Sequence, residues 1–132
     1  MLKSSDKELE TWARTLFKVI DAEDAQGFAD YFCEGGVFIF GSFPTACGKS
    51  TIRDFVAGFF SSLKGLHHEL VQIVAAGGLL YIHFEVTYEV HDGNKVTIPG
   101  LETVKMKGDL IEEYVIYMDP SPLLALQSTS AE

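Results

Sequence analysis

The sequence predicts an α+β domain in which helices pack on one face of a curved, mainly antiparallel sheet. Apolar residues recur at helical spacing in the first half of the chain, as far as Leu63. From His67 onward they fall into strands joined by short turns that contain glycine. The chain has 132 residues, of which 47% are hydrophobic and 22% are charged, so it has room for one domain with a real core.

Three helices are expected before the strands. The first follows residues 5–8, Ser-Asp-Lys-Glu, which have the spacing of a capping box. A second helix is expected over residues 24–32, followed by a short buried strand over residues 37–40. The third helix is expected to start with Ser50 as its cap and to end at Gly65. The apolar stripe of the first helix consists of Leu9, Trp12, Ala13, Leu16, Phe17 and Ile20.

Four consecutive strands are expected in the second half of the chain. Asp92-Gly93 is typical of a two-residue hairpin turn, because both positions accept a positive φ. Gly77-Gly78 and Lys107-Gly108 mark the other two turns, so the strands should form an antiparallel meander. Pro99-Gly100 lies inside the third strand and predicts a bulge or a sharp bend there. The expected strands are 68–75, 79–91, 95–107 and 109–119.

The net charge of the chain argues against two classes of partner, nucleic acids and membranes. The chain has 10 Lys and Arg residues against 19 Asp and Glu residues, which gives a net charge of -9. Such a surface repels phosphate backbones and anionic lipids, so we expect neither a nucleic acid nor a membrane as partner. The sequence shows no secretory signal and no apolar run long enough to cross a bilayer, which favours a cytoplasmic location. Cys33 and Cys47 are expected to be free thiols, with a disulfide between them left open.

The spacing of the histidines and glycines does not match the known patterns of metal and nucleotide sites. His67 and His68 are adjacent on a strand, so their side chains point to opposite faces. His83 and His91 share a face but lie roughly 26 Å apart at about 3.3 Å per residue. We therefore expect no metal site. Residues 41–51 resemble a phosphate-binding loop, but six residues separate its glycines where that motif has four.

The candidates for chemistry are polar side chains set into apolar strands. In strand 79–91, hydrophobicity turns the face with Phe84 inward and leaves the face with Glu85 for water or a partner subunit. Asp119 ends an apolar run, where it either binds nearby amides or stands beside an apolar pocket. In a pocket, desolvation would raise its pKa and suit it to proton transfer. His68 is a second candidate acid or base, or a hydrogen-bonded histidine at the sheet edge.

A family resemblance is carried by stretches spread along the chain. They are the first helix with Trp12, Tyr31-Phe32, and residues 48–55, 66–70, 88–93 and 111–119. In these stretches the sequence resembles the nuclear transport factor 2-like superfamily and its SnoaL-like polyketide cyclase and ketosteroid isomerase relatives. The resemblance implies one cone-shaped domain over residues 1–124, with three helices on a curved sheet, followed by a flexible tail over 125–132.

The resemblance also implies a site. Catalytic members of the superfamily hold an apolar substrate between helices and sheet and move protons with their own side chains, without metal or organic cofactor. Asp119 matches the acidic residue that ends the last strand in SnoaL-like cyclases and in limonene epoxide hydrolase. Glu85 and Thr87 fall where that hydrolase has Arg and Asp, which speaks against epoxide hydrolysis. The comparison turns Glu85 and Thr87 toward the cavity, in conflict with the hydrophobic pattern. Strand 37–43 offers no Asp for a ketosteroid isomerase base.

Two function hypotheses follow. The first is a small enzyme that isomerises, cyclises or dehydrates a hydrophobic oxygenated metabolite such as a polyketide or terpenoid. Its proton-transfer groups would be Asp119, His68 and Glu85, and its substrate-binding residues would be Trp12, Tyr31, Thr87, Tyr88 and Tyr117. The second is a non-catalytic small-molecule-binding protein or a dimeric scaffold. A homodimer through the exposed sheet face is expected. A pocket of several hundred Å³ would favour the enzyme, and a cavity filled by phenylalanines would favour the scaffold.

Overall fold

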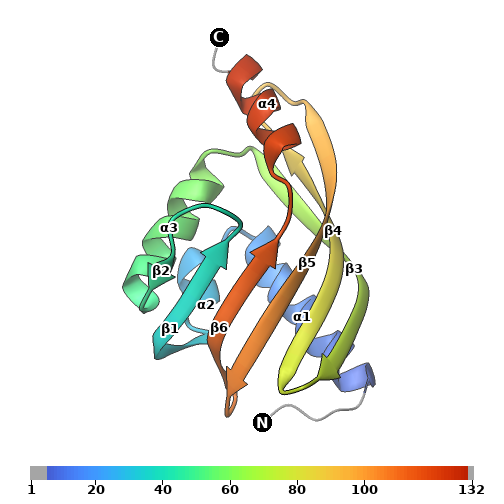
Figure 1. Ribbon diagram of the computed structural model, residues 1–132. Helices are drawn as coiled ribbons and strands as arrows, with labels where there is room; N and C mark the ends of the chain where they lie inside the picture. The colour runs from blue at the N-terminus through green and yellow to red at the C-terminus, as the bar shows by residue number, and fades with distance from the viewer. Residues whose placement is uncertain (1–5, 131–132) are drawn as a thin grey trace.

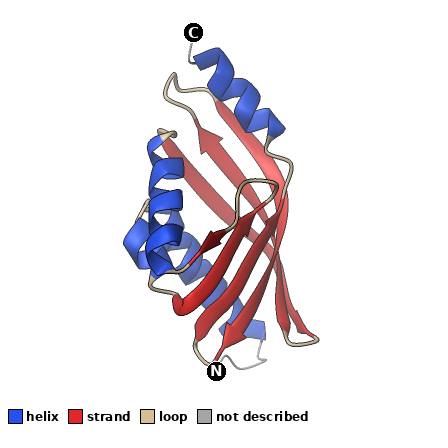
Figure 2. Cartoon of the chain, turned by 60° about the vertical axis from the view of Figure 1, so that its left-hand side comes forward, coloured by secondary structure: helices blue, strands red, loops and turns tan. Residues whose placement is uncertain are grey.

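The computed structural model describes residues 6–130 and confirms the α+β class. Six strands form one curved sheet in the order β2-β1-β6-β5-β4-β3 (Figure 1). Three helices, α1 (Asp6–Asp21), α2 (Ala25–Ala29) and α3 (Lys49–Ser61), cover one face of the sheet, which we call the inner face (Figure 2). None of these three helices packs over the opposite face, which we call the outer face. The strands are β1 (Phe32–Phe40), β2 (Ala46–Cys47), β3 (Gly65–Ala76), β4 (Leu79–Glu89), β5 (Lys95–Lys107) and β6 (Leu110–Tyr117).

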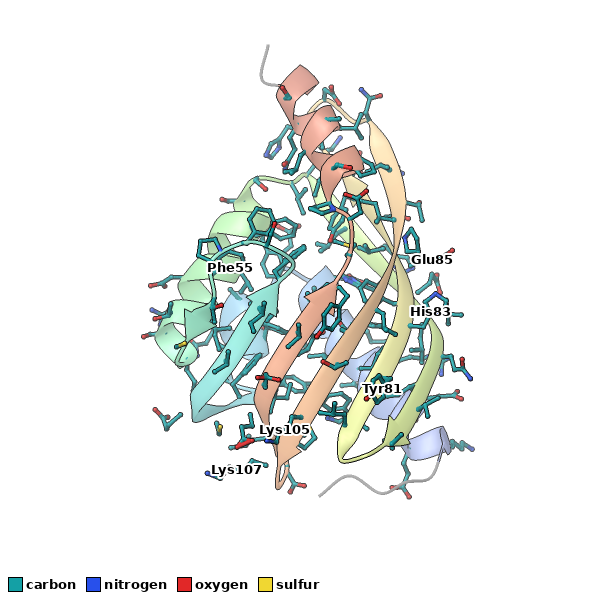
Figure 3. The ribbon with its side chains drawn as sticks, viewed as in Figure 1. Phe55, Tyr81, His83, Glu85, Lys105 and Lys107 are labelled. Carbon is teal, nitrogen blue, oxygen red and sulfur yellow. The ribbon has the colours of Figure 1, made fainter. Side chains whose placement is uncertain are left out.

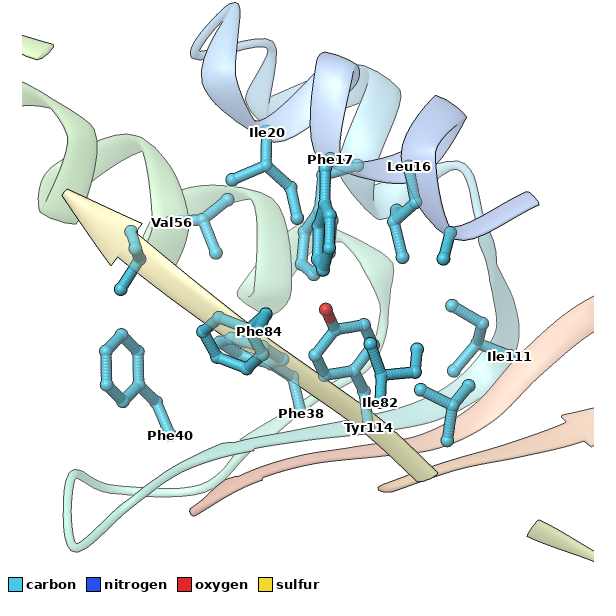
Figure 4. Packing of buried hydrophobic residues seen from close by; sticks show 14 of the residues in the cluster. Leu16, Phe17, Ile20, Phe38, Phe40, Val56, Ile82, Phe84, Ile111 and Tyr114 are labelled. Carbon is cyan, nitrogen blue, oxygen red and sulfur yellow. The ribbon is translucent and has the colours of Figure 1, made fainter. Parts of the chain in front are cut away.

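Helix α1 lies along the sheet with the predicted apolar stripe facing inward. Leu16, Phe17 and Ile20 point toward Phe84 and Tyr114 of the sheet (Figure 4). All five are at most 9% exposed, so they form part of one continuous core. The predicted capping box cannot be followed in full, because its Ser5 lies outside the described residues.

The other two inner-face helices differ from their predicted limits. Helix α2 stops at Ala29, and the Asp24 side chain caps it by accepting a hydrogen bond from the Gly27 N–H (2.9 Å). Helix α3 has Gly48 as its N-cap, at φ 89°, so the predicted cap at Ser50 is wrong. A positive φ at this turn suits glycine, because a Cβ would strain the backbone.

A fourth helix, α4 (Ser121–Ser130), follows the sheet where the sequence suggested a tail from residue 125. Leu123 anchors it at 1% exposure, and Gln127 Nε2 donates to the backbone oxygen of Ser62 at the end of α3 (3.2 Å). The predicted tail is therefore helical as far as Ser130.

The predicted meander is confirmed, with β3, β4, β5 and β6 paired in sequence and antiparallel. Strand β1 adds to its edge by pairing parallel with β6. The bulge predicted at Pro99-Gly100 is absent from the β4–β5 pairing, since Glu85 and Phe84 pair with these two residues in unbroken register. The β5–β6 pairing begins only at Leu101, so Pro99 lies where no β6 residue needs its missing N–H. At Gly100 an added Cβ would lie 2.5 Å from the Phe84 ring, so glycine makes room for that ring.

The structure of β4 shows which of its side chains point toward the inner face, the point on which the hydrophobic pattern and the family comparison disagreed. Phe84, Val86 and Tyr88 are at most 3% exposed on the inner face. Glu85 is exposed on the outer face, in line with Tyr81 and His83 along the strand (Figure 3). The hydrophobic pattern was therefore right, and the facing taken from the epoxide hydrolase comparison was wrong, because β4 has no bulge that would turn Glu85 inward.

The remaining sequence-based expectations concern compartment and thiols. Within residues 6–130, no helix is long and apolar enough to cross a membrane. Cys33 is half-buried, Cys47 is exposed, and both carry free thiols.

Candidate functional site

A small pocket lies on the inner face between the sheet, α2 and α3. Its volume is about 40 Å³, which is room for a few water molecules and well below the roughly 300–1,000 Å³ typical of sites for drug-sized ligands. Twelve of its lining residues are apolar or aromatic, namely Ile20, Phe28, Phe38, Phe40, Phe55, Val56, Phe59, Phe60, Leu66, Tyr88, Tyr114 and Ile116. The two others, His68 and Glu102, are the titratable groups that could carry acid–base chemistry.

Aromatic rings narrow this pocket. Phe59 on α3 packs edge-on against Phe40 (5.3 Å between ring centroids) and against Tyr88 (5.7 Å). Phe55, one turn earlier, packs against Phe38 (5.8 Å). Phe55 and Phe59 are only half-buried. They are therefore the lining rings with most freedom to move when a ligand enters.

His68 reaches the pocket from β3 and is held by Asp21, the last residue of α1. The Asp21 carboxylate accepts two hydrogen bonds from it, one from the backbone N–H (2.8 Å) and one from the ring Nδ1 (2.6 Å). The His68 ring also stacks on Phe17 at 4.8 Å with a 20° angle between planes. Because a carboxylate can only accept, Nδ1 carries the ring proton and Nε2 is left free to accept another. This arrangement fits a general base with its positioning carboxylate.

Glu102 enters the pocket from the middle of β5 and is 1% exposed. The Tyr114 hydroxyl hydrogen-bonds its carboxyl group, but Oε1 has no partner among the described residues. Burial raises the pKa of Glu102 to about 8, so the carboxyl is mostly protonated at neutral pH. Burial and the neighbouring Glu102 also raise the pKa of Tyr114. A protonated carboxyl with a free oxygen in an apolar pocket can donate a hydrogen bond or a proton to a ligand.

Two of the residues predicted from the sequence line this pocket, His68 and Tyr88. Tyr88 is 3% exposed, and burial raises the pKa of its hydroxyl well above its usual range. Trp12 and Tyr31 are half-buried and pack edge-on against each other (6.1 Å), apart from the pocket lining. Burial raises the pKa of Tyr31 as well.

The other four predicted site residues lie outside the pocket. Asp119 is exposed, and its Oδ1 accepts a hydrogen bond from the Ser121 N–H (3.0 Å) at the start of α4. That bond lowers the pKa of Asp119 and corresponds to the amide-binding alternative. Glu85 is exposed on the outer face, where Thr87 shares a hydrogen bond with Thr97 (2.8 Å). Tyr117 is 57% exposed.

Sequence reasoning missed Asp21 and Glu102. The sequence could have identified Glu102, because it lies on the same face of β5 as Ile98 and Val104. An acidic residue is unexpected on such a buried apolar face. Asp21 had no such signal, because only folding brings it to His68, 47 residues further along the chain.

Comparison with solved structures shows the same fold in proteins of low sequence identity. A hypothetical protein with a ketosteroid isomerase-like fold from Catenulispora acidiphila, in complex with trimethylamine, superposes with a TM-score of 0.80 at 14% identity, covering 88% of this chain and 91% of that one. TerC, co-crystallised with polyporic acid, gives 0.75 at 13% identity, covering 86% and 92%. A proposed SnoaL-like polyketide cyclase from Jannaschia gives 0.70 at 16% identity, covering 86% and 88%.

Comparison by sequence agrees with the fold. No curated protein matches the chain. The model of the SnoaL-like domain, in contrast, matches residues 13–114. That stretch runs from the buried stripe of α1 to Tyr114 in β6 and includes Asp21, His68 and Glu102. With more than half of its length matched, and with the curved sheet and three covering helices of the fold in place, the chain belongs to the SnoaL-like family.

Proposed function

We propose that this protein is an enzyme that moves protons on a small, hydrophobic, oxygenated metabolite, using its own side chains as acid and base. One observation carries the proposal. Two titratable side chains line the same apolar pocket, a histidine held by a carboxylate and a buried carboxyl whose pKa is about 8. Such pairs are typical of proton-transfer sites.

The division of roles follows from the hydrogen bonds. His68 Nε2 takes a proton from a carbon next to a substrate carbonyl, and Asp21 stabilises the imidazolium that forms. Glu102 donates to the carbonyl oxygen as negative charge develops there. Return of the proton from His68 to a different carbon completes an isomerisation, and no other reactant is needed. Dehydration or cyclisation uses the same two groups, with the proton delivered to oxygen.

The proposal also accounts for the aromatic lining. Exclusion of water strengthens the interactions of a charge with fixed donors, and an apolar wall suits an apolar substrate. A pocket of about 40 Å³ admits such a substrate only if Phe55 and Phe59 turn outward. TerC, which has a similar fold, was co-crystallised with polyporic acid, and this supports a hydrophobic oxygenated ligand for the present pocket.

Deuterium exchange tests the proposal whatever the product of the reaction is. Neutral metabolites that raise the melting temperature are incubated with the protein in D2O, and NMR follows deuterium entering beside their carbonyl groups. The protein should accelerate exchange for at least one of them, and His68→Gln should reduce that rate about 100-fold or more. Absence of exchange for every bound metabolite would contradict the proposal.

A non-catalytic small-molecule-binding protein is the second candidate. The small volume of the pocket and the dominance of phenylalanine in its lining favour it. The Catenulispora protein of similar fold was crystallised in complex with trimethylamine, a small amine. In this case small amines should raise the melting temperature, and no metabolite should undergo exchange.

We also propose that the chain forms a homodimer through the outer face. Apolar side chains follow one another across four strands there, with Val74 beside Tyr81 and Leu101 beside Tyr117. Light scattering after gel filtration should give twice the chain mass, and Leu101→Lys should give a monomer. A wild-type monomer at high concentration would contradict the dimer.

A further inference from the structure

Glu102 offers the pocket a buried carboxyl oxygen that a ligand group could bind. A buried polar atom without a partner is costly, and native proteins rarely leave one in place. Glu102 Oε1 has no partner among the described residues, although its carboxyl group is otherwise held by Tyr114. Glu102 is one of the residues that line the pocket. A ligand group placed there would satisfy it.

The surroundings of that oxygen favour a cation. Eight phenylalanine and tyrosine residues that line the pocket offer π-faces and edges, and none of the described lining residues is Lys or Arg. Aromatic side chains attract organic cations, most of all alkylammonium groups, whose charge is spread over apolar methyls. The net charge of -9 adds a field that draws cations toward the protein. These residues are Phe28, Phe38, Phe40, Phe55, Phe59, Phe60, Tyr88 and Tyr114.

We propose that the pocket binds a small alkylammonium head group, with Glu102 as its counter-ion, and that binding expels the proton of the Glu102 carboxyl into solvent. The inference rests on the second candidate function, binding of a small molecule, and adds the charge of the ligand and the residue that recognises it. The balance is simple: the cation enters, one proton leaves, and the net charge of the pocket stays the same.

The exchange makes affinity depend on pH. Below about pH 8 the cation competes with the Glu102 proton, so affinity should rise with pH and level off above that value. The other titratable groups facing Glu102 are Tyr114 on β6, Tyr88 on β4 and His68 on β3, with Asp21 of α1 behind the histidine. Both tyrosines stay neutral in this range, because burial raises the pKa of each hydroxyl. α2, α3 and β1 contribute only apolar side chains.

Calorimetry with tetramethylammonium chloride tests the inference on the wild-type protein. Titrations at pH 6, 7, 8 and 9 should show affinity rising by up to about tenfold per pH unit below pH 8. At pH 7, titration in two buffers of different ionisation enthalpy should show nearly one proton released per cation bound. Choline should bind more tightly than 3,3-dimethylbutan-1-ol, its uncharged isostere. Equal binding of the two, or no proton release, would overturn the inference.

Two variants assign the effect to one carboxyl. Glu102→Gln keeps the size of the side chain and removes its charge, so it should abolish proton release and weaken tetramethylammonium binding about tenfold or more. Glu113→Gln makes the same change on the neighbouring strand β6, outside the pocket lining, and should leave both unchanged. The wild-type proton count is decisive should Glu102→Gln fail to fold.

The outcomes separate this inference from the functions on which it stands. If neutral compounds bind and cations do not, the binding function stands and the role of Glu102 as counter-ion is wrong. If nothing binds, both are wrong. Deuterium exchange that depends on His68 bears only on the enzymatic proposal.

Discussion

Each face of the sheet carries a histidine and a glutamate, but the pair on the inner face lines the pocket and the pair on the outer face is exposed. On the inner face, His68 and Glu102 lie among aromatic rings, and burial raises the pKa of Glu102 to about 8. On the outer face, His83 and Glu85 lie on the exposed side of β4. Position across the sheet, rather than residue type, therefore sets the electrostatic surroundings of these groups, since water screens the charges of the outer pair and not those of the inner pair.

The largest expected effect compares the two histidines. His68→Gln should lower any proton-transfer activity about 100-fold or more, because it removes the free ring nitrogen beside the pocket. His83→Gln makes the same change on the outer face and should leave the rate unchanged. Exchange rates measured by NMR on one bound metabolite decide the comparison. Equal losses in the two variants would show that the effect on activity is not local to the pocket.

The next effect concerns two glycines with different surroundings. Gly100→Ala should destabilise the fold by about 1–3 kcal/mol, because its Cβ would enter the space of the Phe84 ring. Gly58→Ala, in the open on α3, should stabilise the fold by about 0.5–1 kcal/mol through helix propensity. Urea unfolding measures both free energies, and a neutral Gly100→Ala would mean that the Phe84 ring is not held against β5.

The fold was predictable because it depends on patterns that are local in sequence. Alternation along residues 79–91 identified the buried face of β4, and glycine turns located the hairpins. The site was predictable only in part. His68 and Tyr88 lie at the pocket, but the partner of His68 comes from a distant helix, and Glu102 was overlooked on an apolar face. Asp119 matched a family pattern, yet in the structure its carboxylate accepts a hydrogen bond from the first N–H of the helix that follows it.

A smaller effect is the dependence of stability on pH. The pKa of Glu102 is raised in the folded state from an ordinary value of 4.5 to about 8, so the folded state holds a proton that the unfolded chain releases. This contribution to stability is complete below pH 4.5 and is lost as pH rises toward 8, at up to about 1.4 kcal/mol per pH unit. Glu102→Gln should flatten this part of the curve, whereas Glu85→Gln on the outer face should not. Urea unfolding between pH 5 and 9 provides the test.

The smallest expected effect is at Asp119. Asp119→Ala removes the hydrogen bond to the Ser121 N–H and should slightly loosen the start of α4, with a small fall in melting temperature. Any exchange activity should be retained, because the pocket lining does not include this residue. Loss of activity with the fold intact would restore Asp119 as a catalytic candidate.

The protonation of Glu102 underlies both the acid–base site and the cation site, and it can be measured directly. Carboxyl ¹³C NMR of glutamate-labelled protein, with Glu102→Gln to assign the resonance, gives the pKa of this group in solution. We expect one glutamate resonance to titrate near pH 8 and to be missing in the variant. A Glu102 that titrates near its ordinary value of 4.5 would contradict the account of the pocket.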